Sequence, residues 1–302
     1  MLNMSLKSLA WSVAALLLIV TFASPLMLLT IFLVMTPFVV LFNLLQPKFM
    51  IVHLVLIGII AYFLAGGYGQ GVLSIAFFFL IPSLAMGYIY KRGGKARTAI
   101  STGSVVVLAQ LLIVLLIFTV QFDIDLKAEF SSYLAESLKQ IETGGVLQAG
   151  WAVDTAKTFS DLIMTALPML LLLIAFLLAV ITHGLSRLAF RTVGLEAPSL
   201  PKASTWRAPR SLVMYYLIAM IASFAMSEDA SGYWSIAITN LVPILRFVFT
   251  VQAIGFFFFL AETKKWPRVV PLLFCIPLML FPPAYIIGLL DIAFPMRKFF
   301  VK

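Results

Sequence analysis

The chain alternates between long apolar runs and short polar islands that hold nearly all of its charged residues. This pattern is typical of helices that cross a bilayer, because the hydrocarbon core excludes ions and takes about 20 apolar residues to span. Six spans need no further subdivision, and they are residues 50–66, 71–90, 98–121, 161–190, 210–226 and 234–261.

Two other apolar runs are too long for one crossing. Residues 10–45 would form a helix of about 54 Å against a core of about 30 Å. Ser24-Pro25 is the natural break, because proline has no backbone N–H to donate, and it predicts segments near 8–23 and 26–45. Residues 269–295 are predicted to turn at Phe281-Pro282-Pro283 into a short hairpin. The fold class expected is all-α, a single polytopic transmembrane bundle of 8–10 segments over residues 1–302.

A polar stretch at about 122–160 interrupts the spans and has a helical period of its own. We expect an amphipathic helix here, ended by Gly144-Gly145. A second helical stretch should start at Val146 and run into the span predicted at 161–190. Either it rests on lipid as an interfacial helix, or it is a lid over an outward-facing cavity. Its apolar stripe comprises Leu126, Phe130, Tyr133, Leu134, Leu138 and Ile141.

Composition supports the membrane assignment, since 63% of the residues are hydrophobic and 11% are charged. If the N-terminus is cytoplasmic, 17 of the 21 Lys and Arg residues lie inside, and most acidic residues lie in the outer loops. We therefore expect a multi-pass protein of the cytoplasmic membrane with both termini inside. The net charge of +9 reflects this topology, and no nucleic-acid partner is expected because the cations are spread over separate loops.

Polar side chains inside predicted spans are the first candidates for function, because burying them in lipid is costly. Arg246, in the span predicted at residues 234–261, stays charged and needs a partner. It could pair with Asp291, the acidic residue of the final apolar run, snorkel to the interface or form hydrogen bonds, or bind an anionic ligand.

Three amides within the spans are also candidates for ligand binding. Asn240 and Gln252, in the span predicted at 234–261, and Gln110, in the span predicted at 98–121, could line a pocket. They could equally join helices by hydrogen bonds. His53 and His183 lie near helix ends without a further ligand at metal-binding spacing, so interfacial anchoring explains them and no metal is expected.

No set of residues matches a catalytic motif or a cofactor site. We therefore expect a protein that is not an enzyme and has no cofactor. A membrane-embedded lipid-processing enzyme is a minor alternative, with Asp291 as its titratable candidate. Ala10 and Ala14 in the first span have the spacing of a small-xxx-small face, which serves either internal packing or contact with a partner.

Three motifs together resemble the YybS-like family of uncharacterised bacterial membrane proteins, over essentially the whole chain. They are Pro198-Ser199-Leu200-Pro201 with Trp206-Arg207-Ala208-Pro209, Asn240 with Gln252-Ala253-Ile254-Gly255, and Gly288-Leu289-Leu290-Asp291 with Arg297-Lys298.

That family is similar in fold to the S components of energy-coupling-factor transporters. The resemblance implies a small-molecule-binding subunit that docks on a membrane coupling subunit with its ATPases, and it would match Ala10 and Ala14 to the docking helix. The alternative is a scaffold or regulatory partner of another membrane protein, without transport activity.

Overall fold

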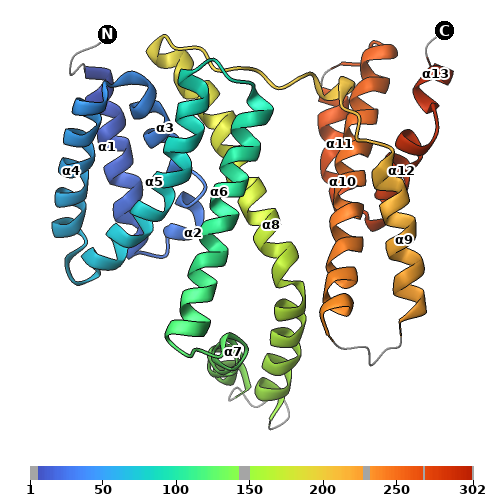
Figure 1. The fold of residues 1–302 in the computed structure, drawn as a ribbon, viewed down its shortest axis with the longest axis horizontal. Coiled ribbons are helices and arrows are strands. Elements are labelled where there is room, and N and C mark those ends of the chain that lie inside the picture. Colours follow the sequence, from blue (N-terminus) through green and yellow to red (C-terminus); the bar gives the residue numbers. More distant parts are fainter. Residues whose placement is uncertain (1–5, 143–149, 227–231, 268, 301–302) are drawn as a thin grey trace. The chain divides into compact units, whose positions relative to one another are not determined.

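The computed structural model describes residues 6–142, 150–226, 232–267 and 269–300, and within these ranges the chain is helical without any strand (Figure 1). Six of the described helices are long and apolar enough to cross a membrane. They are Leu6–Ala23, Pro47–Leu64, Gly66–Lys91, Ala96–Gln121, Trp151–Val193 and Tyr233–Thr263. Only 11% of the most apolar window of Ala96–Gln121 is buried, so most of its apolar surface is left for lipid.

The helices group into two compact units. The first comprises Met1–Ile124 and Leu171–Leu200, and the second comprises Asp125–Leu170 and Pro201–Lys302. The long helix α8 (Trp151–Val193) contributes to both. The prediction of one transmembrane domain stays a prediction.

In the first unit, helices α1, α4 and α5 each contact the buried helix α3, among the blue and cyan ribbons of Figure 1. Along the chain its elements are α1 (Leu6–Val20), η1 (Thr21–Ala23), α2 (Met27–Thr30), α3 (Met35–Leu44), α4 (Pro47–Leu64), η2 (Gly66–Tyr68), α5 (Gly69–Lys91), α6 (Ala96–Leu116) and a π-helical turn (Ile117–Gln121).

The predicted break at Ser24-Pro25 is confirmed, but the span predicted for 26–45 is wrong. Residues 31–34 form turns between α2 and α3, so neither piece can cross a bilayer. Pro37 explains the second break, because its missing N–H cannot bond to Leu33 one turn earlier, and the Leu33 carbonyl accepts from Thr36 instead, at 3.1 Å. Helix α3 is almost entirely buried, which explains its apolar sequence without lipid contact.

His53 and His183, interpreted above as interfacial anchors, are buried in the first unit instead. The Ser12 hydroxyl lies 2.6 Å from His53 Nδ1, and the Tyr90 hydroxyl lies 2.8 Å from His183 Nδ1. Both histidines therefore join helices. Among the described residues no group of His, Cys, Asp and Glu could hold a metal ion.

In the second unit, α10 (Tyr233–Thr263) packs against α12 (Tyr285–Ala293) and α9 (Ser211–Ala225). A Cβ atom on Gly288 of α12 would fall on the backbone carbonyl of Phe249, so this contact requires glycine. The turn predicted at Pro282-Pro283 is confirmed, since α11 (Val269–Leu280) and α12 are separated by η5 (Pro282–Ala284). The remaining elements are η4 (Ala203–Thr205) and α13 (Met296–Phe300).

The amphipathic helix predicted in the long loop is confirmed as α7 (Leu126–Glu142). Asp125 caps its start, accepting from the N–H groups of Lys127 and Ala128 at 3.0 Å. At its end, Glu142 accepts from the N–H groups of Gly150 and Ala152, at 2.6 and 3.1 Å. This carboxylate caps α8, which begins at Trp151 and includes the span predicted at 161–190, while Gly144-Gly145 and the predicted start at Val146 lie outside the described residues.

Candidate functional site

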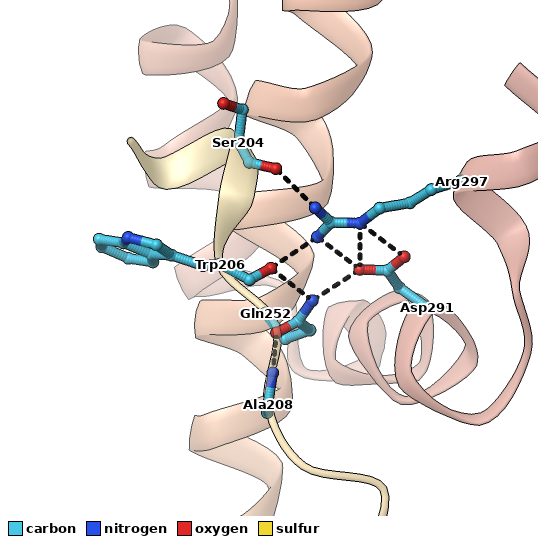
Figure 2. A network of polar contacts seen from close by, with 6 residues as sticks. All are labelled: Ser204, Trp206, Ala208, Gln252, Asp291 and Arg297. Carbon is cyan, nitrogen blue, oxygen red and sulfur yellow. Dashed lines mark hydrogen bonds and ion pairs between the residues drawn. The ribbon is translucent and has the colours of Figure 1, made fainter. Parts of the chain in front are cut away.

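A buried ion pair lies at the centre of a polar network in the second unit (Figure 2). Asp291, on the last turns of α12, is fully buried, and Arg297 on α13 binds it with Nε and Nη2 3.0 and 2.8 Å from the two carboxylate oxygens. Arg297 also donates to the carbonyls of Ser204 and Trp206, at 2.5 and 2.8 Å. A buried charge pair is tolerated when its remaining donors and acceptors are satisfied, as they are here.

Gln252 on α10 completes the network. Its amide nitrogen donates to Asp291 at 2.6 Å and to the Trp206 carbonyl at 3.2 Å, and its oxygen accepts from the Ala208 N–H at 2.9 Å. The irregular segment before α9 is thus tied to α10 and α12, as Figure 2 shows. Because all three polar positions of the Gln252 side chain bind protein atoms, we assign the network a structural role.

Of the alternatives open for Arg246, pairing with Asp291 is contradicted, because Arg297 binds that carboxylate. The physical reason is the turn at 294–295, after which α13 brings Arg297 back onto the carboxylate. Arg246 instead donates to the Tyr216 hydroxyl at 3.2 Å and lies over the Tyr285 ring, 5.2 Å from its centroid. Contacts with aromatic rings and a phenol satisfy a cation that is partly exposed.

Asn240 joins α10 to α8 through its carboxamide, next to Pro168 of α8. Its oxygen accepts from the Met169 N–H at 3.0 Å, and its nitrogen donates to the Thr165 carbonyl at 2.8 Å. Residues 165 and 169 are the two ends of one i to i−4 helical bond, so the amide bridges that pair directly. The adjacent Pro168 weakens the α8 ladder there, because it has no N–H.

A pocket of about 500 Å³ lies beside this bridge, between α8 and α10. Its walls are mainly apolar, with threonine hydroxyls and one carboxylate, Asp161. Asp161 also pairs with Lys127 of α7 at 2.5 Å, so α7 is attached to the pocket wall. This contact raises the pKa of Lys127, chiefly through the hydrogen bond to Asp161. The lining residues are Thr158, Asp161, Leu162, Thr165, Ala166, Met169, Thr239, Asn240 and Pro243.

Comparison with known proteins places this architecture in a family. The family described as "Predicted membrane protein (DUF2232)" matches residues 12–292. The chain belongs to this DUF2232 family. An uncharacterised protein of Bacillus subtilis (strain 168), YybS, is 24% identical over 237 residues, which cover 75% of each chain. No solved structure matches the chain.

The DUF2232 match includes Asn240, Gln252 and Asp291 but ends before Arg297. The resemblance to YybS-like proteins is confirmed by these comparisons. Sequence reasoning missed Arg297 as a site residue, because it was grouped with the cytoplasmic cations at the end of the chain. The available signal was that Asp291 and Arg297 are six residues apart, with Pro295 between them to turn the chain.

The other predicted site residues belong to the first unit. The amide nitrogen of Gln110 donates to the Phe78 carbonyl at 3.0 Å, which joins α6 to α5. Ala10 is exposed, whereas Ala14 borders an apolar groove of about 320 Å³. The face of α1 that packs inside the unit carries Ser8, Ser12, Ala15 and Ile19. Ala10 is therefore available to lipid or to a partner, and the partner contact stays a prediction.

Proposed function

We propose that this DUF2232 protein is a binding subunit that takes a small, mainly apolar molecule from the outer side of the membrane, like an S component of an energy-coupling-factor transporter. The observation that supports this proposal is the pocket between α8 and α10. A volume of about 500 Å³ falls within the range of small-molecule sites, and apolar walls with a few hydroxyls and one carboxylate match the usual composition of such sites. Binding in this pocket needs no catalytic group.

Helix α7 acts as the lid of this pocket in our proposal. Its attachment through Lys127 and Asp161 is an exposed ion pair, which contributes little free energy and can open at low cost. The Glu142 cap on the first turn of α8 gives the helix a second attachment. Opening at Lys127 while Glu142 holds would let α7 swing without leaving the protein.

The charge distribution within the second unit supports an outward-facing pocket. Asn240 lies near the start of α10, whereas Lys264 and Lys265 follow its end, so about 36 Å of helix separates them. Cations near the end of α10 favour a cytoplasmic position for that end. The pocket and α7 then lie on the outer side.

A partner that supplies energy completes the proposal. The exposed Ala10 and half-buried Ala14 of α1 would contact a membrane coupling subunit associated with ATPases, since small residues allow close approach of helices. Co-purification of such a subunit, and its loss in Ala10→Trp, tests this contact.

The pocket itself is tested by filling it. Ala166→Phe places a ring in the pocket, and the matched control Ala225→Phe adds the same ring on the exposed end of α9. Metabolites extracted from gently purified protein are quantified by mass spectrometry. We expect one small molecule near stoichiometric amount in the wild type and in Ala225→Phe, and at least about tenfold less in Ala166→Phe, since an overpacked cavity excludes its ligand.

The scaffold function is the second candidate, and the complete satisfaction of Gln252 by protein atoms favours it. Wild-type protein that carries no small molecule and co-purifies with a stoichiometric partner lacking ATPases would replace the transport proposal with this one.

A further inference from the structure

A second pocket lies in the second unit, at the end of α10 opposite to Asn240. It has a volume of about 590 Å³ and is formed by η4, the last turns of α10 and the first turn of α11. Unlike the pocket between α8 and α10, it is lined by lysines. Its lining residues are Lys202, Ala203, Ser204, Phe258, Ala261, Glu262, Lys265, Trp266, Pro271 and Leu272.

Lys265 lines this pocket from an unusual backbone position. The Trp266 N–H bonds to the Ala261 carbonyl at 2.8 Å, and the Lys265 N–H bonds to the Glu262 carbonyl at 3.3 Å. These are the two bonds of a Schellman motif, whose left-handed residue is usually glycine. Lys265 occupies that position with φ of 56°, a conformation disfavoured for a residue with a side chain. A cation is therefore held at the pocket despite a backbone cost.

The charges of the pocket leave one cation available. Lys202 pairs with Glu262 at 3.0 Å, whereas the ion pairs found among the described residues do not include Lys265. Phe258 and Leu272 supply apolar wall beside these charges, and Trp266 is 43% exposed. Tryptophan next to lysine at a helix end is typical of the membrane–water interface. The pocket thus combines an available positive charge with an apolar wall, beside a helix end of interfacial composition.

We propose that this pocket binds the phosphate headgroup of an anionic phospholipid, with Lys265 as its principal contact and Phe258 and Leu272 against the upper acyl chain. Basic pockets between membrane helices on the cytoplasmic side suit anionic headgroups, because the phosphate and the chain are satisfied together. Glu262 moderates the affinity by neutralising Lys202. This site does not depend on the outer pocket or on the proposed transport function.

The test uses a pair of glycine variants of the full chain. Lys265→Gly removes the pocket cation at a position that glycine prefers, so the fold is retained, whereas Lys264→Gly removes an equal charge from the exposed neighbouring residue that does not line the pocket. Each protein is titrated in detergent with phosphatidylglycerol or phosphatidylcholine, and bound lipid is counted by native mass spectrometry. We expect phosphatidylglycerol to bind preferentially, with about fivefold weaker binding in Lys265→Gly and unchanged binding in Lys264→Gly.

Glu262→Gln provides a gain-of-function arm, because it frees Lys202 from its carboxylate. We expect tighter binding of phosphatidylglycerol in this variant and no change with phosphatidylcholine. Equal binding of the two lipids, or an equal loss in both glycine variants, would overturn the proposal. Inorganic phosphate and glycerol 1-phosphate distinguish the source of the phosphate: competition by either at concentrations near that of the lipid would assign the pocket to a soluble anion instead.

Discussion

Arg297 binds both carboxylate oxygens of Asp291, although the two residues lie on different helices separated by a turn. Asp291 is fully buried, and the side chain of Arg297 is 12% exposed. The pair holds α12 and α13 to the Ser204–Trp206 backbone and to Gln252. Stability of the second unit should therefore depend on it.

We expect Asp291→Ala to destabilise the protein by about 3 kcal/mol, because it leaves the Arg297 charge buried without its counter-ion. Lys298→Ala removes an exposed cation next to Arg297 and should have almost no effect. Unfolding temperatures of the detergent-purified proteins measure both. If the network contributed nothing to stability, the two variants would have the same unfolding temperature.

Asn240→Leu should destabilise the protein by about 2 kcal/mol. Leucine has the same branching and number of side-chain heavy atoms as asparagine but cannot satisfy the Met169 N–H and the Thr165 carbonyl next to Pro168. Thr239→Val, at the exposed preceding position, is the control. Hydrogen exchange of α8 should increase around residue 169 in Asn240→Leu, and unchanged exchange there would contradict the bridging role.

Gly288→Ala should lower stability by about 2 kcal/mol or more, because the added methyl group overlaps the Phe249 carbonyl, which is backbone and cannot rotate away. Gly184→Ala introduces the same change on α8, where nothing lies within 4 Å of the new atom. That control should be neutral or slightly stabilising, since alanine favours helix over glycine. Thermal unfolding of the two variants makes the comparison.

Asp161→Asn should lower the pKa of Lys127 toward its ordinary value of 10.5, because the hydrogen bond to Asp161 is the main cause of the raised pKa. Since the folded-state pKa is raised, the stabilisation from this pair is complete at neutral pH and is lost as the pH rises through the folded-state pKa. NMR titration of ¹³C-dimethylated lysines measures the shift, with Lys139 on the same helix as the reference. An unchanged Lys127 titration would show that α7 is not attached at Asp161.

Local signals were enough to predict much of the fold. The breaks at Pro25 and Pro282-Pro283 follow from a missing N–H, and α7 follows from its apolar stripe, since both effects act within one or two turns of helix. The apolar run at 26–45 was misread, because a helix buried in protein and a helix in lipid have equally apolar sequences, and only the breaks around Pro37 separate them.

By itself, the sequence determined that the chain is helical and lies in a membrane, because composition and hydrophobic period depend on each segment alone. Only the tertiary structure decided which polar groups meet: Asp291 with Arg297, Asn240 with the α8 backbone, and Lys265 in the second pocket. Such pairings depend on where the chain turns and which helix faces approach. A buried charge binds whichever partner the fold brings within reach, and hydrophobic pattern does not specify that partner.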